Sequence, residues 1–411
     1  MIQYREKDLF CEDVPLADIA KSEGTPCYVY SQAAILQRYR AYDEAFGETP
    51  HRICYAVKAN SNLAVLRLLA EAGAGFDIVS GGELFRVLSA GGVPSKIVFS
   101  GVGKTEPELT YALREQVVHF NCESEPEVAL LDALAGRLGV RARVALRVNP
   151  DVDAVTHPYI STGLREHKFG IDIAAAEAAY QRARGLPNIV LEGVSCHIGS
   201  QILDVDPLLQ AVGKAAELVE RLRARGLTIT SLDLGGGIGV AYKPTDEAPS
   251  IPGFIQAACR RLAGSGLTLM IEPGRSIVAD AGVLLTRVLY RKHNGAKEFV
   301  IVDAAMNDLI RPALYHSYHE IVPLRLNGDR GQIQADVVGP VCESGDFFAR
   351  DRDVANVLPG DLMAIKTAGA YSFVASSNYN SRPRAAEVLV DGVGYRVVRR
   401  RETYEDLVRG E

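Results

Sequence analysis

Four short segments of this sequence place reactive side chains where short apolar strands are expected to end. Lys58 stands in the segment CYAVKAN, and Glu272 and Arg275 stand in IEPGRS. His197 follows another apolar stretch in CHIGSQ, and the triplet Gly235–Gly237 follows a fourth. A lysine amine at the end of a buried strand loses hydration, which lowers its pKa and makes it a nucleophile for a carbonyl group.

The other three segments offer complementary chemistry. Three successive glycines let backbone N–H groups close around a phosphate without interference from Cβ atoms. A carboxylate such as Glu272 can hold a pyridine nitrogen protonated, which makes the ring an electron sink. His197 could stack on a flat ring. Taken singly, each segment also has a plain structural explanation: a lysine that reaches outward into water, an ordinary tight turn, or a core histidine.

The elements that must position these residues alternate between strand and helix patterns. Short apolar, β-branched stretches predict eight strands, each followed by a polar turn and a segment with helical spacing. The predicted strands are Ile53–Val57, Phe76–Val79, Ile97–Phe99, His119–Asn121, Val144–Val148, Val190–Cys196, Leu232–Leu234 and Leu269–Ile271. Eight such units in about 240 residues are typical of a (β/α)8 barrel, and an open doubly wound sheet rarely repeats so often. In a barrel, the strand ends that carry the reactive residues converge on one face.

After about Asp280 the pattern changes to alternating segments separated by Gly, Pro, Asn and Asp, which is typical of an all-β domain. Residues 1–33 carry one clear strand, Cys27–Tyr30, which we expect to join the C-terminal sheet. The sequence therefore predicts an α/β fold: a (β/α)8 TIM-type barrel over residues 34–280, and a β-sandwich or β-barrel domain formed by residues 1–33 and 281–411.

The composition excludes several classes of protein. The chain has 411 residues, of which 47% are hydrophobic and 23% charged, and its net charge of −6 disfavours nucleic acid or an anionic membrane as a partner. The tight basic run Arg399–Arg401 is followed at once by acidic residues, and we interpret it as solvated surface. Seven cysteines without a CxxC pair predict neither disulfides nor a metal site, and no apolar run reaches membrane-spanning length, so we expect a cytoplasmic protein.

The motifs occur in the order and spacing of one known family. The chain resembles the group III pyridoxal-phosphate decarboxylases, which have an alanine-racemase-like barrel, and within them the branch that acts on diaminopimelate. The matching motifs extend over nearly the whole chain and are YAVKAN, FDIVSGGEL, HKFGI, HIGSQ, GGGIG, EPGRSIV, MNDLIRPALY, CESGD and YNSRPR. One departure is Thr367, where the family pattern has an aspartate before the segment AGAY.

The resemblance implies roles for individual residues. Lys58 carries pyridoxal phosphate covalently, Glu272 pairs with the ring nitrogen, and His197 stacks on the ring. The implied cofactor-binding residues are Lys58, Asp77, His197, Ser200, Gly235, Gly236, Gly237, Glu272, Gly274, Arg275 and Tyr371. Cys342 in CESGD is the implied proton donor and completes the catalytic set with Lys58 and His197, although a cysteine beside acids is often inert.

The resemblance also implies a substrate. The implied substrate-binding residues are Arg275, Arg311, Tyr315, Glu343 and Tyr371. Arg311 decides the substrate class, because arginine offers bidentate hydrogen bonds to a distal carboxylate, which ornithine lacks. The implied reaction is the decarboxylation of meso-2,6-diaminopimelate to L-lysine and carbon dioxide, carried out by a homodimer with shared active sites.

Other functions stay open at this point. One is a sister decarboxylase of ornithine, arginine or carboxynorspermidine. Another is a non-enzymatic pyridoxal-phosphate carrier or an inactive regulatory homologue, but such proteins tend to lose the reactive lysine or the acid–base loop, and this chain keeps Lys58 and Cys342. A barrel scaffold without a cofactor is disfavoured by the polar and glycine-rich residues at the strand ends.

Overall fold

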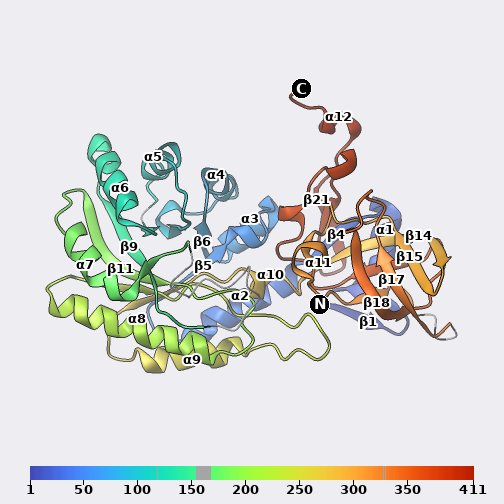
Figure 1. Ribbon diagram of the computed structural model, residues 1–411, viewed down its shortest axis with the longest axis horizontal. Helices are drawn as coiled ribbons and strands as arrows, with labels where there is room; N and C mark the ends of the chain where they lie inside the picture. The colour runs from blue at the N-terminus through green and yellow to red at the C-terminus, as the bar shows by residue number, and fades with distance from the viewer. Residues whose placement is uncertain (118, 154–167, 327, 329) are drawn as a thin grey trace. The chain divides into compact units, whose positions relative to one another are not determined.

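The computed structural model of the chain describes residues 1–117, 119–153, 168–326, 328 and 330–411 (Figure 1). Contacts divide the chain into two compact units. Unit 1 comprises Met1–Arg38, Ala241–Asp246 and Arg275–Glu411, and unit 2 comprises Tyr39–Val240 and Glu247–Gly274. The motif HKFGI is described only from Lys168 onward, and its histidine lies outside the described residues. Within the described ranges, none of the helices combines the length and hydropathy that crossing a bilayer requires.

Unit 2 contains a closed barrel of eight parallel strands, and this confirms the fold predicted from the sequence. In order round the barrel the strands are β5 (His51–Ala56), β6 (Gly75–Ile78), β7 (Ile97–Phe99), β8 (His119–Cys122), β9 (Ala142–Asn149), β11 (Ile189–Cys196), β12 (Ser231–Asp233) and β13 (Thr268–Ile271). Pairing of β13 with β5 closes the barrel, and the short strand β10 (Ile171–Asp172) pairs beside β9. All eight predicted strands overlap the observed ones.

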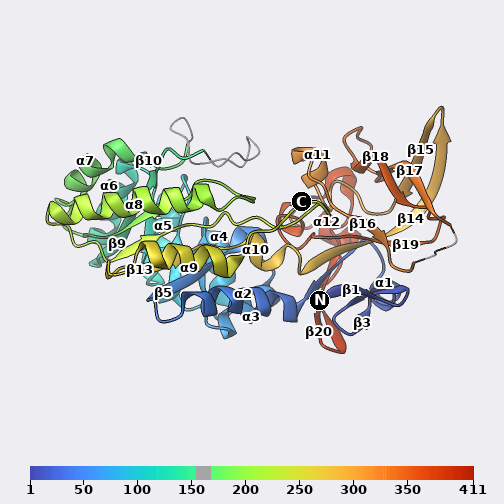
Figure 2. The ribbon, with the colours of Figure 1, turned by 90° about the horizontal axis from the view of Figure 1, so that it is seen from below.

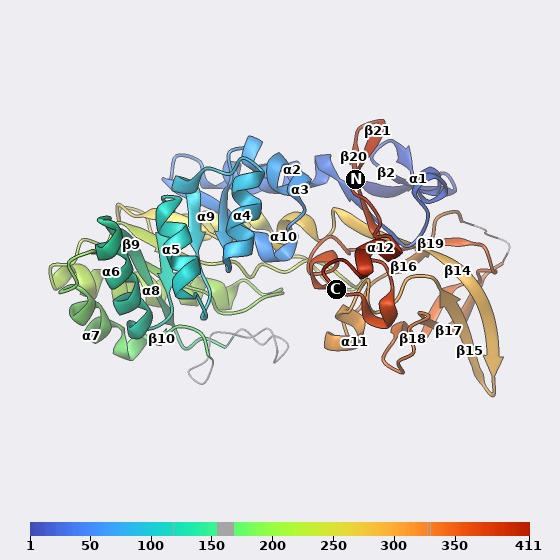
Figure 3. The same cartoon turned by 90° about the horizontal axis from the view of Figure 1, so that it is seen from above.

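Helices connect consecutive barrel strands. They are α3 (Leu63–Glu71), α4 (Gly81–Ser89), α5 (Glu106–Arg114), α6 (Glu125–Leu138), α7 (Ile173–Ala183), α8 (Asp206–Ala224) and α9 (Ile251–Arg261), with α2 (Gln32–Phe46) before β5 and the short turns η1 (Val57–Ala59) and η2 (Pro94–Lys96). Helices α4, α5 and α6 stand side by side (Figures 1 and 3), and α8 lies beside α9 (Figure 2). Ser80, Ser124 and Ser250 begin α4, α6 and α9, because each side chain accepts a hydrogen bond from an N–H group three residues later.

Large side chains from consecutive strands fill the barrel unit. Tyr55, Phe76, Phe99 and Phe120 come from β5, β6, β7 and β8, and each is fully buried. The rings of Tyr55 and Phe76 meet edge to face with centroids 6.5 Å apart. Burying one aromatic side chain contributes roughly 3 kcal/mol. This packing holds the strand ends, and therefore the residues they carry, in fixed positions.

Unit 1 is built mainly from strands, as the sequence predicts for the second domain. Its larger sheet has the order β18 (Phe347–Ala355), β17 (Gln332–Val338), β15 (Lys297–Val302), β14 (Gly282–Asn294), β4 (Cys27–Ser31), β20 (Ala386–Asp391) and β21 (Gly394–Arg399), with β19 (Leu362–Ile365) on β14 and β16 (Ile321–Pro323) on β19. Its helices and turns are α1 (Leu16–Glu23), α10 (Arg275–Val278), α11 (Arg311–Tyr315), α12 (Tyr404–Leu407), η3 (Phe373–Ala375) and η4 (Tyr379–Ser381). Strand β4 pairs with both β14 and β20, which confirms that the N-terminal strand joins the C-terminal sheet.

Residues 1–33 contain more than the single strand predicted. Strands β1 (Ile2–Arg5), β2 (Asp8–Cys11) and β3 (Val14–Pro15) form a separate small sheet beside α1 (Figure 2). These three strands were not predicted, because the turns of this sheet lack the usual glycine or asparagine. Glu6 and Glu12 adopt the positive φ values of 52° and 53° that such turns need.

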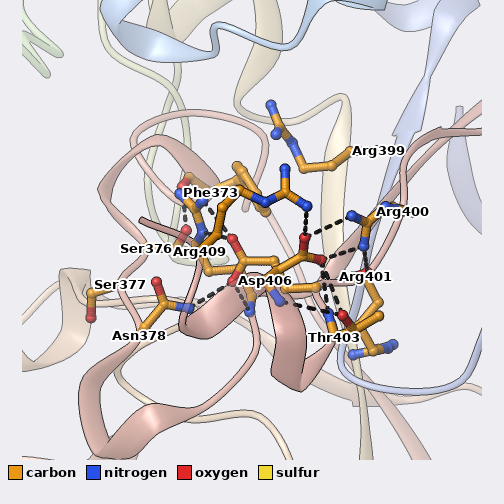
Figure 4. A network of polar contacts seen from close by, with 12 residues as sticks. Phe373, Ser376, Ser377, Asn378, Arg399, Arg400, Arg401, Thr403, Asp406 and Arg409 are labelled. Atoms are coloured by element: carbon orange, nitrogen blue, oxygen red, sulfur yellow. Dashed lines mark hydrogen bonds and ion pairs between the residues drawn. The ribbon is translucent and has the colours of Figure 1, made fainter. Parts of the chain in front are cut away.

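The basic run near the C-terminus is not simply solvated. Arg399 pairs with Glu387, a fully buried carboxylate of β20. The Nη2 of Arg401 donates a hydrogen bond to the carbonyl oxygen of Pro26 at 2.7 Å. Arg400 is exposed and pairs with an acidic residue of α12 (Figure 4). The interpretation as solvated surface is therefore correct for Arg400 alone, because Arg399 and Arg401 are partly buried and bond to Glu387 and Pro26.

Candidate active site

Lys58 lies just after β5, in the turn η1, at the carboxyl end of the strand. Its Nζ forms an ion pair with Oδ2 of Asp77, which is a fully buried residue of β6. The side chain of Lys58 is 39% exposed, so the amine is not withdrawn from water as the sequence analysis expects. The position at the barrel mouth keeps the amine accessible to a ligand, and Asp77 holds it in place.

A cluster of polar side chains surrounds Glu272, which directly follows β13. Its Oε1 accepts hydrogen bonds from Ser100 Oγ at 3.1 Å and from Asn121 Nδ2 at 3.0 Å. The same amide nitrogen donates to Oδ2 of Asp233 at 2.7 Å. Burial, and then the carboxylates of Asp233 and Asp77, raise the pKa of Glu272 well above its ordinary value. Three carboxyl groups thus share the one amine of Lys58, and a further cationic group would favour the ionised form of Glu272.

His197 follows β11 and has a neutral ring. Its Nδ1 accepts a hydrogen bond from the N–H group of Gly236 at 3.2 Å, so the proton of the ring lies on Nε2. Burial first, and then the charges of Arg147 and Lys58, lower the pKa of His197 well below its ordinary value. A flat, uncharged ring can stack on a cationic aromatic ring without charge repulsion.

The glycine triplet after β12 is a place of close backbone approach. A Cβ atom on Gly235 would lie 2.6 Å from the carbonyl oxygen of Cys196, and one on Gly236 would lie 2.4 Å from that of Glu272. The N–H group of Gly235 bonds to Asp233 Oδ1 at 2.9 Å, and that of Gly236 bonds to His197. Glycine is required here because the ends of β11, β12 and β13 meet without space for side chains.

In unit 1, Arg275 and Arg311 flank the ring of Tyr242. Nη1 of Arg275 donates to the hydroxyl of Tyr242 at 2.8 Å, and the guanidinium of Arg311 lies 4.4 Å from the ring centroid. The guanidinium of Arg275 also lies 4.7 Å from the ring centroid of Tyr371. Both arginines are more than nine-tenths buried. Buried guanidinium groups are favourable when an anion accompanies them, so the pair suits a carboxylate.

The segment CESGD forms a tight loop that exposes Cys342 and Glu343. The carboxylate of Asp346 accepts a hydrogen bond from the N–H group of Val341 at 2.7 Å. The N–H group of Cys342 donates to Oδ1 of Asn380 at 2.7 Å. These bonds hold the backbone that leads into Cys342, while its side chain is exposed.

The structure places the predicted site residues in both units. In unit 2, contacts and close approaches connect six of them: Lys58, Asp77, His197, Gly235, Gly236 and Glu272. Gly237 completes the glycine triplet, and Ser200 lies in the loop after His197. Gly274 lies close to Ala56 and Ala59. In unit 1, Tyr242 connects Arg275 and Arg311, Tyr371 lies beside Arg275, and Tyr315 ends the helix that Arg311 begins. Cys342 and Glu343 lie on their own exposed loop.

Sequence reasoning missed six residues of these two groups. They are Ser100, Asn121, Arg147 and Asp233 in unit 2, and Tyr242 and His319 in unit 1. Asn121 and Asp233 lie in barrel strands near their carboxyl ends, and polar residues at such positions are a signal that could have found them. Tyr242 and His319 carry no such signal, because only long-range packing brings them to the arginines.

Comparisons with known proteins identify the family. The pyridoxal-binding domain of the pyridoxal-dependent decarboxylases matches residues 32–279. The chain is 58% identical over 409 residues to the diaminopimelate decarboxylase of Pseudomonas aeruginosa, covering 99% of this chain and 98% of that protein. The chain belongs to the diaminopimelate decarboxylase family. This family relationship confirms the resemblance seen in the sequence, the decarboxylase class and pyridoxal phosphate as the cofactor.

Solved structures of diaminopimelate decarboxylases share the fold over the whole chain. The Helicobacter pylori enzyme complexed with L-lysine is 44% identical, with a TM-score of 0.92, and the match covers 96% of this chain and 98% of that one. The M. jannaschii enzyme in co-complex with L-lysine is 37% identical, with a TM-score of 0.95, and the match covers 100% and 97%. Both the barrel and the β domain are therefore features of the diaminopimelate decarboxylase fold.

The barrel mouth fits pyridoxal phosphate. Asp77 Oδ1 and Asn121 Oδ1 are buried, and neither has a hydrogen-bond partner within the described part of the chain. The acidic surplus at Glu272 matches the protonated ring nitrogen of the cofactor. The neutral ring of His197 and the amine of Lys58 lie in the same strand-end cluster. The donor set of this member of the diaminopimelate decarboxylase family therefore has the chemistry that the cofactor requires.

Proposed function

We propose that this protein removes carbon dioxide from meso-2,6-diaminopimelate to give L-lysine, the last step of lysine biosynthesis. The observation that carries the choice of substrate is the buried pair Arg275 and Arg311, which suits a carboxylate remote from the one that leaves. The names of the relatives support the same substrate, and two solved relatives hold L-lysine, the proposed product. Ornithine has no second carboxylate for these arginines.

The cofactor is proposed to be bound mainly at the barrel mouth. The proposed binding residues are Lys58, Asp77, His197, Ser200, Gly235, Gly236, Gly237, Glu272, Gly274, Arg275 and Tyr371. When bound, pyridoxal phosphate supplies a conjugated ring that accepts electrons from the substrate. Asp77 holds the amine of Lys58, and Ser100 and Asn121 hold the carboxyl group of Glu272, which would pair with the ring nitrogen.

The substrate is proposed to be held by residues of unit 1. Arg275, Arg311 and Tyr315 bind the distal carboxylate, Glu343 binds the distal ammonium group, and Tyr371 contacts the substrate. The Sγ atom of Cys342 delivers a proton to the carbon that has lost its carboxylate. The rigid backbone around the thiol supports this role, because little reorganisation is needed when the substrate arrives.

We also propose a homodimer with shared active sites. Cys342 and Glu343 are exposed although their loop is rigid, which fits residues that act on a second copy of the chain. Mixing Lys58→Ala chains with Cys342→Ala chains tests this: each mixed dimer would regain one intact site, so that activity returns. Two inactive variants that stay inactive after mixing would contradict shared sites.

Two further proposals concern the chain as a whole. The cofactor-binding domain is proposed to span residues 34–280, with residues 1–33 and 281–411 in the β domain. The protein is proposed to work in the cytoplasm, which the seven free cysteines support, because reduced thiols persist in a reducing compartment.

The test of the function is turnover by the purified protein reconstituted with pyridoxal phosphate. We expect carbon dioxide release from meso-diaminopimelate, with L-lysine as the product, and little from ornithine, arginine or carboxynorspermidine. Arg311→Ala should lower kcat/KM for diaminopimelate at least ~10-fold, because a charge-assisted hydrogen bond is lost. Arg325→Ala, at an exposed arginine, is the matched control. Preferential turnover of one of the other amino acids would refute the proposal.

Lys58→Ala tests the covalent anchor of the cofactor. We expect kcat to fall by ~10³-fold or more, as it does when an enzyme loses its nucleophile. The visible absorbance of the bound cofactor should be lost as well. Lys292→Ala, at an exposed lysine of β14, should keep both properties. If the protein is instead a carrier or an inactive homologue, the wild-type chain should show the absorbance of the bound cofactor but no turnover.

A further inference from the structure

His319 is fully buried in unit 1 and lies between α11 and β16. Its Nε2 is 2.8 Å from Nη1 of Arg311, and its Nδ1 is 2.8 Å from the carbonyl oxygen of Lys366. Lys366 directly follows β19, and the chain continues from there to Tyr371. The imidazole ring therefore joins the two stretches of chain that carry Arg311 and Tyr371.

The partners of the ring fix its protonation. A guanidinium nitrogen can only donate, so Nε2 of His319 must accept the hydrogen bond from Arg311. A carbonyl oxygen can only accept, so Nδ1 must carry the proton that bonds to Lys366. Only the neutral ring with its proton on Nδ1 makes both bonds. Burial first, and then the charge of Arg311, lower the pKa of His319 to about 3, which keeps this form at neutral pH.

Tyr242 supports the same guanidinium from another side. The ring of Tyr242 lies 4.4 Å from the guanidinium of Arg311 and meets the ring of His319 edge-on, with centroids 5.3 Å apart. Its hydroxyl accepts a hydrogen bond from Arg275. Arg311 is thus held by a hydrogen bond at Nη1 and by an aromatic face, which leaves its other nitrogens to meet a ligand.

We propose that His319 is a positioning residue that sets Arg311 for the distal carboxylate of the substrate. It thereby helps the protein to select amino acids with a second carboxylate over simple diamines. This inference rests on the proposed function. Any buried histidine needs partners for its ring nitrogens, but here one of the two partners is the guanidinium group of a proposed substrate-binding arginine.

Two substitutions separate the two bonds of the ring. His319→Gln places an amide oxygen near the position of Nε2, so it can still accept from Arg311 while the bond to Lys366 is lost. His319→Asn places an amide near the position of Nδ1, so it can still bond to Lys366 while the bond to Arg311 is lost. The two variants differ by a single methylene group, and each keeps one polar contact; binding of a ligand without the distal carboxylate controls for the smaller size of asparagine.

The readout is the binding of two ligands to the holoenzyme, measured by titration calorimetry. L-Lysine keeps the distal carboxylate, and 1,5-diaminopentane is the same molecule without it. We expect His319→Asn to weaken lysine binding by ~10-fold or more and to leave diaminopentane binding unchanged. His319→Gln should bind both ligands nearly as the wild type does. Equal losses for both ligands, or equal effects of the two substitutions, would show a structural role and overturn the proposal.

The outcome does not depend on turnover, so it is distinct from the test of the function. If the wild-type protein fails to decarboxylate diaminopimelate, the proposed function is refuted. If the wild type decarboxylates diaminopimelate but His319→Asn keeps the ligand preference of the wild type, only this inference is refuted. Should the Asn variant not fold, ¹⁵N NMR of the ring nitrogens in the wild-type holoenzyme decides. A neutral ring protonated on Nδ1 is expected, and a proton on Nε2 would contradict the assigned bonds.

Discussion

The barrel mouth of unit 2 and the arginine site of unit 1 carry opposite surpluses of charge. The carboxyl groups of Asp77, Asp233 and Glu272 interact in the first, and the buried guanidinium groups of Arg275 and Arg311 both contact Tyr242 in the second. Each surplus matches a ligand group of opposite sign: the ring nitrogen of the cofactor in unit 2 and a carboxylate of the substrate in unit 1. Ionisable groups of one sign that gather in this way and shift one another's pKa are typical of functional sites.

Both sites also use a neutral histidine as a hydrogen-bond acceptor. His197 accepts from the backbone of Gly236, and His319 accepts from Arg311. In each case burial, followed by nearby positive charge, lowers the pKa of the ring. A protonated ring could not accept, so these surroundings preserve the contact that positions the neighbouring group. A buried, neutral histidine therefore occurs in both sites, although their charges are opposite.

Of the changes that test this contrast between the two sites, Glu272→Gln should have the largest effect. Glutamine keeps the size of the side chain and can still accept from Ser100 and Asn121, but it cannot balance a cationic ring nitrogen. We expect kcat for diaminopimelate to fall by ~10²-fold, which is typical of removing one charge-stabilising group from an active site. Glu220→Gln, at an exposed residue of α8, should leave kcat unchanged. An unaltered kcat in Glu272→Gln would mean that the negative surplus of unit 2 plays no part in the reaction.

Arg399→Ala sharpens the contrast between structural and binding arginines. Arg399 has a buried carboxylate of its own, Glu387, whereas Arg311 bonds to an imidazole. Removing Arg399 leaves that carboxylate with the hydroxyl of Tyr30 but without a cation. We expect the free energy of unfolding to fall by about 2 kcal/mol, below the usual cost for a fully buried pair because Arg399 is partly exposed.

The control for Arg399→Ala is its neighbour. Arg400→Ala, at an exposed position with a surface ion pair, should leave the midpoint of urea unfolding unchanged. Activity per folded molecule should equal that of the wild type in both variants, since neither arginine belongs to the proposed site. Identical unfolding midpoints for the two variants would remove the distinction between them.

Glu83→Gln has the smallest expected effect and concerns the pH dependence of stability. Burial raises the pKa of Glu83 from 4.5 to about 7, so the folded protein keeps a proton that the unfolded chain has already lost. Stability should therefore fall as the pH rises from 4.5 to 7. Glutamine can still accept from the N–H group of Val79 but does not titrate, so the decline should be smaller by about 1 kcal/mol.

Urea unfolding of the protein without added cofactor, at several pH values across this window, measures the effect of Glu83→Gln. Part of the decline should remain in the variant, because burial also raises the pKa of Asp308 in unit 1 to about 7. The arginine pair does not titrate in this range. Parallel pH profiles for the wild type and the variant would contradict the assignment to Glu83.

The sequence was sufficient to predict the barrel but not the whole of unit 1. Apolar, β-branched stretches such as Ile189–Cys196 have one structural solution when helices follow them, because both faces of the strand are covered. The short strands β1 to β3 escaped prediction because charged residues occupy their turns. The alternating segments predicted after Asp280 were Val283–Tyr290, Phe299–Asp303, Gln332–Val338, Asp361–Ile365 and Ala386–Val390. They did not include β16, β18 and β21, since edge strands keep a polar face and show a weaker apolar pattern.

The same contrast holds for the site residues. Lys58 and the glycine triplet were found because local motifs and strand ends mark them. The exposure of the Lys58 side chain was not predicted, because accessibility depends on the shape of the barrel mouth rather than on the adjacent sequence. His319 was not found, since its partners Arg311 and Lys366 come together only when β16 pairs with β19. Local chemistry is visible in a sequence, whereas the support of one side chain by another is a property of the fold.

The place of β4 between β14 and β20 has a consequence for synthesis of the chain. A ribosome makes β4 before any barrel strand, yet β20 begins only at Ala386. Every barrel strand, from His51 to Ile271, has been translated before β14 starts. The barrel can thus form while translation continues, whereas the edge of β4 that pairs with β20 stays open until Ala386 and the residues after it have been made. A chain that terminates before Ala386 would have a complete set of barrel strands, but one edge of β4 would be unpaired and prone to aggregation.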